Sequence, residues 1–547
     1  MICLLHGWLL EGSGSNLWTR SIITALARQG ETVHLVCQEN HPDRYAAIAE
    51  AHRHRLSGEI DTTLERETEF PGKCILHQPD IGRTLPVFVR DRYEEYDHVV
   101  PMVELPDDEI EMYIARNVDV VLRIVDEHDI AAIHANHAVL MPVVAERVKA
   151  ATGVPYAIMP HGSGIEYAVK KDDRFRRYAA SALEKCGRVF VIGSEMRDRV
   201  TTVFPELPHI SGKFSELHLG VDSSQFEPVD RSGRAASIRT LCQSLRETPR
   251  GKKGEQSARM TAELGGSMDR AALGDALSNA GRYDLKRPDA DVEKKLTAID
   301  WSNAPVLIFT GRIISPKGIH NVIAALPLIL ERVPDLHLVV VGHGPLREPM
   351  EALLHGLRTG DRQLVDRIVR WGYALEGSPE GEDLDDDLQD LTRFFARLEQ
   401  AGTTDRYFSL AMKHLRPDTV VFTGYLTHRE LRYLFPCCDA GVFPSVVREA
   451  GPLVFLESLA SGSFPLGTYF GGMAASIDAV AGELPSEVGE AMKLSVDNTV
   501  DDIISHVPDA IALSAKYGRD LARIAQERYD WKSVARTLHD ELHGMRG

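Results

Sequence analysis

The stretch from Ala440 to Gly462 constrains the fold of this chain more than any other. Apolar residues from Ala440 to Phe443 predict a buried strand, and a polar loop follows it. Gly451 and Pro452 then open an apolar helical pattern, with proline at the helix start and glycine just past its end. The stretch therefore predicts a strand, a loop and a helix in succession.

The start of this helix is predicted to bind an anion. The backbone N–H groups of Leu453 and Val454 have no acceptor within the helix and carry the positive end of its dipole, so a phosphate would fit there. Glu449 precedes the helix and Glu457 lies inside it. Two carboxylates beside an anion site suit sugar and ribose hydroxyls. The alternative is that each glutamate is an exposed surface charge, as single glutamates usually are.

A second motif lies upstream of the first. The strand-like run Pro305–Thr310 is followed by Gly311 and Arg312, and then by Lys317 and Gly318. Arg312 offers a planar fork to two phosphate oxygens, and Lys317 offers a point charge. Combined with the glutamate pair, this Gly-Arg-x4-Lys-Gly motif resembles the donor site of retaining nucleotide-sugar glycosyltransferases of the glycogen-synthase-like type, known as family four.

The resemblance implies an α/β chain with the GT-B fold, in which two Rossmann-like, doubly wound domains face each other across a cleft. It also implies which residues hold the donor: Gly14, Gly311, Arg312, Lys317, Gly344, Tyr425, Glu449, Gly451, Pro452, Leu453, Val454 and Glu457. In this scheme Arg312 and Lys317 clamp the diphosphate, Glu449 orients the sugar and Glu457 the ribose. The catalytic set is Glu449, His161, Arg312 and Lys317.

The reaction that the resemblance implies is transfer of a hexosyl group from a nucleotide diphosphate sugar to an acceptor hydroxyl, with retention of anomeric configuration. The electrostatic clamp would stabilise the departing diphosphate, so no metal and no cofactor are expected beyond a UDP-, GDP- or ADP-linked donor. Two alternatives remain open. One is a nucleotide-sugar 2-epimerase of the same fold, and the other is a non-catalytic protein that binds nucleotide sugars.

The acceptor side is expected in the first half of the chain, where polar residues follow predicted strands. In open α/β sheets, ligands bind at the carboxyl ends of the strands. The strand Ala131–His134 leads into Asn136 and His137, and either of these two side chains could face the substrate. His161 follows the next strand, Pro155–Met159. The expected acceptor-side residues are Gly12, Ser13, His134, Asn136, His137 and Gly162.

Length and patterning predict two domains with insertions, since 547 residues are too many for one core. We expect an N-terminal domain over residues 1–220, onto which a C-terminal helix at about 530–547 packs back, and a nucleotide-sugar domain over residues 300–525. Residues 231–299 form an insertion. Its part 231–253 has seven basic residues and one acidic residue, and it is either a mobile basic arm or a small helical insert. An acidic insertion spans about 357–418, and its run 376–390 carries eight acidic residues and is expected to be solvated.

Composition excludes several classes of protein. The formal net charge of −18 opposes general binding of nucleic acid, because the average field repels a phosphate backbone. No apolar run is long enough for a transmembrane helix, and the N-terminus lacks the basic region of a signal peptide. Seven cysteines without a paired spacing indicate reduced thiols. A cytoplasmic enzyme is therefore expected, with an unidentified acceptor and an unspecified oligomeric state.

Overall fold

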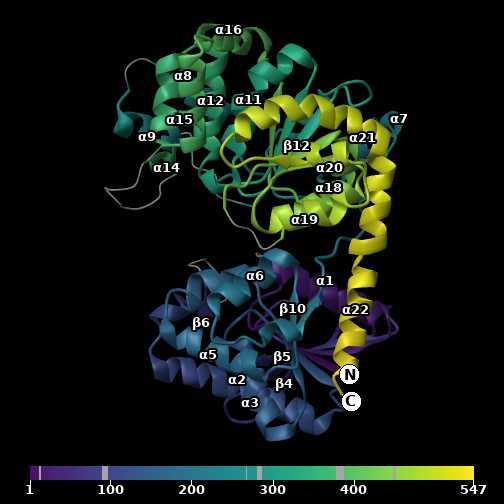
Figure 1. The fold of residues 1–547 in the computed structure, drawn as a ribbon. Helices are drawn as coiled ribbons and strands as arrows, with labels where there is room; N and C mark the ends of the chain where they lie inside the picture. The colour runs from purple at the N-terminus through teal and green to yellow at the C-terminus, as the bar shows by residue number, and fades with distance from the viewer. Residues whose placement is uncertain are drawn as a thin grey trace. The chain divides into compact units, whose positions relative to one another are not determined.

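The computed structural model describes residues 1–11, 14–88, 96–265, 268–279, 286–376, 387–447 and 451–546. The chain forms two compact units. Unit 1 comprises residues 1–221 and 527–547, and unit 2 comprises residues 222–526. The chain therefore leaves unit 1 once and returns to it near its end (Figure 1). Within the described ranges, no helix is long and apolar enough to cross a membrane.

Unit 1 is built on a nine-stranded sheet with β1 near its centre. In spatial order the strands are β11 (Phe214–Glu216), β10 (Arg188–Val191), β9 (Tyr156–Met159), β8 (Ala132–Asn136), β1 (Ile2–Leu5), β2 (Thr32–Val36), β5 (Lys73–Pro79), β3 (Ile48–His54) and β4 (Ile60–Glu65). Neighbouring strands are parallel except β3 and β4. The apolar strand β1 is buried along its whole length, as a central strand of a parallel sheet must be.

The helices of unit 1 connect these parallel strands, and the last one comes from the C-terminus. They are α1 (Gly14–Arg28), α2 (Asp107–Glu127), α3 (Met141–Thr152), α4 (Gly162–Gly164), α5 (Asp173–Lys185), α6 (Ser194–Val203) and α22 (Trp531–Gly544). A separate parallel pair is formed by β6 (Thr84–Val87) and β7 (His98–Pro101). Helix α22 packs on α1 and β8, so the C-terminal segment forms part of this unit.

Unit 2 contains a six-stranded sheet that is parallel throughout. Its spatial order is β14 (Val420–Gly424), β13 (His337–Val341), β12 (Val306–Thr310), β15 (Ala440–Phe443), β16 (Phe464–Thr468) and β17 (Lys493–Leu494). The order reverses at β12, because β13 lies on one side of it and β15 on the other. Such a switch point is where a doubly wound sheet opens a crevice for ligands at its carboxyl edge.

The helices of unit 2 are α7 (Arg231–Ser244), α8 (Gly254–Glu263), α9 (Arg270–Asn279), α10 (Val292–Thr297), α11 (Ile319–Arg332), α12 (Arg347–Thr359), α13 (Arg362–Arg370), α14 (Gly372–Leu375), α15 (Gln389–Gln400), α16 (Thr404–His414), α17 (His428–Leu434), α18 (Leu453–Ala460), α19 (Gly471–Ala481), α20 (Ser486–Ala491) and α21 (Thr499–Tyr529). Pro452 is the N-cap of α18 and not its first helical residue, a shift of one position from the sequence prediction.

The described residues of the insertion form the helices α7–α10 within unit 2, which favours the helical insert over the mobile arm. Arg234 of α7 is buried and pairs with Asp439 at 3.0 Å. Lys252, which is 1% exposed, pairs with Glu348 at 2.8 Å. These basic residues looked solvated in the sequence because their acidic partners lie far away along the chain.

The two ends of the acidic run are also not solvated. Glu376 is 9% exposed, and its two carboxylate oxygens accept hydrogen bonds from the backbone N–H and the hydroxyl of Ser315. Asp390 accepts a hydrogen bond of 2.7 Å from Asn321 of α11 and pairs with Arg393. Residues 377–386 lie outside the described residues.

Candidate functional site

The loop after β12 carries the two basic residues predicted to bind a diphosphate. Gly311 follows the strand and donates its N–H to Val341 at 3.0 Å, and Ile313 donates to His343 at 2.8 Å. These bonds fix the start of the loop against the end of β13. The backbone is tightest at Gly342, which has φ of +146° and where a Cβ atom would lie 1.8 Å from the carbonyl oxygen of Gly311. Only glycine fits there.

The same loop is joined to the loop after β15. Val446 donates its backbone N–H to Pro316 at 2.9 Å, and the Ser445 hydroxyl donates to the same carbonyl at 3.2 Å. Gly318 has φ of +73°, and a Cβ atom there would lie 2.0 Å from the carbonyl oxygen of Pro444. The structure therefore brings the Arg312–Gly318 segment against the strand end that leads towards α18.

Glu376 also holds this loop, in addition to the contacts with the end of β13 and with the loop after β15. Its carboxylate accepts the two Ser315 hydrogen bonds, midway between Arg312 and Lys317. Burial raises the pKa of Glu376, while the Ser315 hydrogen bonds and the charge of Arg312 act in the opposite direction. No sequence motif indicated this residue, since it lies at the edge of an acidic run that resembles a solvated surface.

Glu457 is buried, which rules out the alternative of a wet surface glutamate for this residue. It is 5% exposed, and its carboxylate lies 2.6 Å from Nε2 of His428, the first residue of α17. His428 was not predicted from the sequence. Glu449, the other member of the pair, lies outside the described residues. Gly451 and Pro452 precede α18, and Leu453 and Val454 form its first turn as expected.

The remaining predicted donor residues lie in other strand-end loops. Gly344 follows β13 with φ of +152°. Tyr425 follows β14, and its ring lies edge-on to His343 with ring centroids 5.4 Å apart. Gly14 is the first residue of α1 in unit 1, and a Cβ atom there would meet nothing within 4 Å. This glycine is thus not required by packing.

In unit 1, the polar residues after β1, β8 and β9 meet in one buried network centred on Asn136. The Asn136 amide donates to Thr19 at 2.9 Å, and its oxygen lies 3.3 Å from Nε2 of both His134 and His161. His6 contacts the Asn136 nitrogen at 3.3 Å. Burial lowers the pKa of His6 and His134 to about 4 and that of His161 to about 3, so all three rings are neutral near pH 7.

His137 differs from its neighbours in this network. It has a positive φ of 68°, is 1% exposed, and neither ring nitrogen makes a hydrogen bond within the described part of the chain. Its ring lies 4.5 Å from Trp8 and 4.7 Å from His161, measured between centroids. Buried polar groups normally have partners, so an unpaired one in a strained backbone conformation marks a candidate ligand contact.

Three residues of this network were missed by sequence reasoning: His6, Thr19 and Asn16. The available signal was the position of His6 directly after β1, which matches the positions of Asn136 after β8 and His161 after β9. Asn16 and Thr19 lie one turn apart on α1, and the Asn16 oxygen lies 3.0 Å from the His6 ring. Gly162 begins α4 behind His161. Gly12 and Ser13 lie outside the described residues.

Two doubly wound sheets, with a basic glycine loop at the switch point of the second, define a two-domain α/β protein. Comparison with known proteins specifies it further. The family model for Glycosyltransferase Family 4 matches residues 12–225, and the model for Glycosyl transferases group 1 matches residues 293–365. Over these residues the chain is similar to glycosyltransferases, and its fold is the GT-B fold that its motifs predicted.

A related protein and two solved structures show the extent of the similarity. A 2-deoxystreptamine glucosyltransferase of Streptomyces kanamyceticus is 24% identical over 236 residues, which are 42% of this chain and 44% of that protein. The match therefore spans less than half of the relative's length. Sucrose-phosphate synthase of Thermosynechococcus elongatus has 14% identity and a TM-score of 0.52, with 100% of this chain and 98% of that chain covered. HepE of Anabaena, in complex with UDP, has 13% identity and a TM-score of 0.51 with full coverage of both chains.

Proposed function

We propose that this chain is a retaining glycosyltransferase that moves a hexosyl group from a nucleotide diphosphate sugar to an acceptor hydroxyl. The observation that carries the proposal is the packing of the Arg312–Gly318 loop against the loop after β15. It supports a basic loop and the amino end of α18 serving the same diphosphate. A guanidinium, an ammonium and helix N–H groups together suffice to neutralise roughly two negative charges, so the proposed reaction needs no metal.

The proposed roles combine the family resemblance with the contacts within each unit. Arg312 and Lys317 bind the departing diphosphate, with Glu376 positioning the loop through Ser315. Glu457, oriented by His428, accepts a hydrogen bond from the ribose. Glu449 orients the sugar. His161 and the residues around Asn136 serve the acceptor side, and the neutral rings there can donate or accept hydrogen bonds without attracting a second anion.

Uridine is the first base to test, because HepE was solved with UDP; GDP and ADP are the other two candidates. We expect Arg312→Ala and Lys317→Ala each to weaken binding of the nucleoside diphosphate by about tenfold or more, since charge-assisted hydrogen bonds contribute about 1.5–3 kcal/mol. Calorimetric titration measures this directly. Lys413→Ala removes an exposed lysine of unit 2 and should leave affinity unchanged. Equal affinity of Arg312→Ala and the unmodified chain would refute the clamp.

Incubation with UDP-, GDP- and ADP-sugars tests the activity itself. Release of nucleoside diphosphate that increases with added acceptor supports transfer. An epimeric nucleotide sugar would show the 2-epimerase instead, and binding without turnover would show a non-catalytic protein. NMR of the product's anomeric proton tests retention, because an α-linked donor must then give an α-linked product. Turnover that survives EDTA supports a metal-independent reaction, and loss of turnover in EDTA argues against it.

We propose a cytoplasmic location from the state of the cysteine thiols. All seven cysteines are unpaired, and six of them are buried. This pattern supports a reducing environment such as the cytoplasm.

A further inference from the structure

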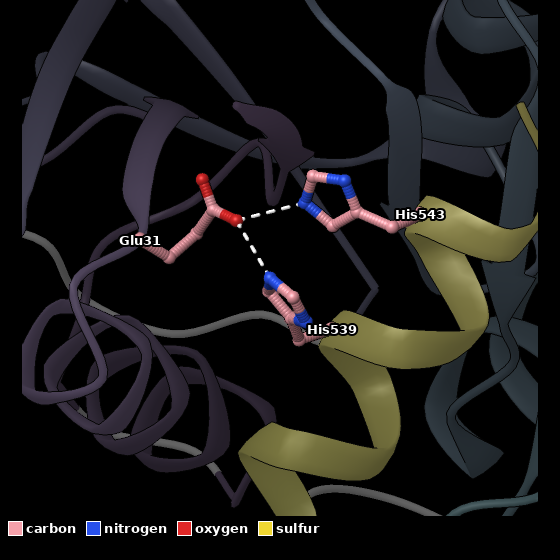
Figure 2. A group of neighbouring side chains, drawn as sticks. All are labelled: Glu31, His539 and His543. Atoms are coloured by element: carbon pink, nitrogen blue, oxygen red, sulfur yellow. Dashed lines mark hydrogen bonds and ion pairs between the residues drawn. The ribbon is translucent and has the colours of Figure 1, made fainter.

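Two histidines of α22 converge on one carboxylate of unit 1, away from the residues assigned to donor and acceptor. His539 and His543 are one helical turn apart, so their rings lie on the same face of the helix. Figure 2 shows both rings pointing at Glu31, which lies in the turn between α1 and β2. The same carboxylate oxygen, Oε2, lies 3.2 Å from Nε2 of His539 and 2.8 Å from Nε2 of His543.

The Glu31 carboxylate is held in place by its other oxygen. Oε1 accepts the backbone N–H of Thr32 at 2.9 Å and lies 3.7 Å from the N-terminal amine. The Glu31 side chain is 8% exposed, whereas those of His539 and His543 are 37% and 34% exposed. The carboxylate is therefore fixed while the imidazoles remain accessible to solvent, from which an ion can arrive.

Asp540 lies beside the other nitrogen of the His539 ring. Its carboxylate lies 3.0 Å from Nδ1 of His539. A hydrogen on Nδ1 donated to Asp540 leaves Nε2 with a lone pair that faces the Glu31 carboxylate. A lone pair and a carboxylate repel each other unless a cation lies between them, and that cation is either a second ring proton or a metal ion. A carboxylate on the far ring nitrogen is also the usual outer partner of a metal-bound histidine.

The position of α22 within unit 1 does not depend on this cluster alone. Glu541 pairs with Arg188 at 3.0 Å, and Gln29 donates to the backbone oxygen of Lys532 at 2.7 Å. Trp531 covers Gly220 so closely that a Cβ atom there would lie 2.3 Å from the indole. These contacts on several sides fix the helix. The three converging side chains are therefore held in place before any ion binds.

We propose that Glu31, His539 and His543 bind a divalent transition metal ion of the Zn²⁺ type, which fastens the returning helix α22 to the α1–β2 corner. Their ligand atoms lie within 4.8 Å of one another. Two imidazole nitrogens and one carboxylate oxygen suit Zn²⁺ at bonds of about 2.0–2.2 Å, with water as a fourth ligand. The bound ion would replace the ring protons, and the contact at 2.8 Å would open by a few tenths of an ångström.

The test is titration of the full, tag-free chain with ZnCl₂ at pH 7.5 after chelator treatment, followed by calorimetry. The unmodified chain should bind one equivalent saturably, and Co²⁺ should give the visible absorption of a low-symmetry nitrogen and oxygen site. His539→Ala, His543→Ala and Glu31→Gln should each weaken binding by about tenfold or more. His209→Ala removes an exposed histidine of unit 1 outside the cluster and should bind as the unmodified chain does.

A stability measurement completes the test. Zn²⁺ at saturating concentration should raise the melting temperature of the unmodified chain and leave that of His543→Ala unchanged, because only binding to the folded state stabilises it. Absence of saturable binding, or binding that the three variants do not weaken, overturns the proposal. EDTA should lower stability in the unmodified chain only. A loss of turnover in EDTA that is equal in His543→Ala would instead concern the reaction and not this site.

Discussion

Two neighbouring residues at the end of β8, Asn136 and His137, differ in their hydrogen bonding. Asn136 is the centre of the buried network, and its amide group is occupied by Thr19 and two histidines. His137 keeps both ring nitrogens without a hydrogen bond inside the described residues. From the sequence, either side chain could face the substrate, because the order of Asn136 and His137 after a strand does not determine their directions. The positive φ of His137 turns its side chain away from the alternation of the strand, which the sequence does not show.

We expect His137→Asn to lower kcat by about tenfold or more while nucleoside diphosphate affinity is unchanged. The substitution keeps a residue that tolerates a positive φ, but it removes the imidazole and with it the hydrogen bond that we propose His137 makes to the substrate. Steady-state kinetics together with calorimetry separate the two effects. Asn136→Ala is the contrasting variant, and it should mainly lower the melting temperature, because it leaves several buried groups without partners. Unchanged turnover in His137→Asn would assign the ring a packing role only.

At the level of elements, the insertion of helices α7–α10 is part of unit 2. Asp289 precedes α10 and is fully buried. Its carboxylate receives two hydrogen bonds from Arg347, at 2.7 and 2.6 Å, and one from Lys295 at 2.7 Å. Its backbone N–H donates to Thr423 of β14 at 2.7 Å. The insertion is thus hydrogen-bonded to β14, the strand that Tyr425 directly follows.

Replacing Asp289 by Asn should therefore destabilise unit 2 by about 3 kcal/mol, because removing one charge of a buried pair leaves Arg347 incompletely compensated. Urea denaturation followed by circular dichroism measures the loss. Asp405→Asn is the matched control. Its side chain is 88% exposed and pairs with Arg362 at 2.7 Å, so the change should cost less than about 1 kcal/mol. Equal losses in both variants would show that the insertion does not support the unit.

The elements could be predicted from the sequence further than the site could. Apolar runs identified the strands β8, β9, β12 and β15 within one or two residues, because central parallel strands need continuous apolar side chains. The Gly-Arg-x4-Lys-Gly loop could also be recognised from the sequence, because its residues are close together along the chain. Glu376 and His428 could not be, since their contacts with Ser315 and Glu457 depend on chain segments that are 61 and 29 residues apart. The burial of Arg234 and Lys252 escaped prediction in the same way.

In the whole molecule, buried neutral histidines are concentrated in unit 1. His6, His134 and His161 have pKa values lowered by burial to about 4, 4 and 3, and burial holds the pKa of His137 well below its usual range. A second row, His34, His77 and His54, crosses the sheet through ring contacts of 3.1 and 3.0 Å, and burial lowers the pKa of all three. We therefore expect the stability of unit 1 to depend on acidic pH more strongly than that of unit 2.

The sign of this effect follows from proton binding. Well above pH 6.5 the histidines are neutral in both states and do not affect stability, whereas between pH 6.5 and about 4 the protons bind mainly to the unfolded chain. Stability must therefore fall as pH falls through this window, by about 1.4 kcal/mol per pH unit for each such histidine. Hydrogen exchange at pH 7 and pH 5.5, corrected for intrinsic rates, should show protection lost in β1, β8 and β9 before β12 and β13. His134→Phe should reduce the pH dependence, while His209→Ala should retain it. Protection that declines equally in both sheets would contradict this account.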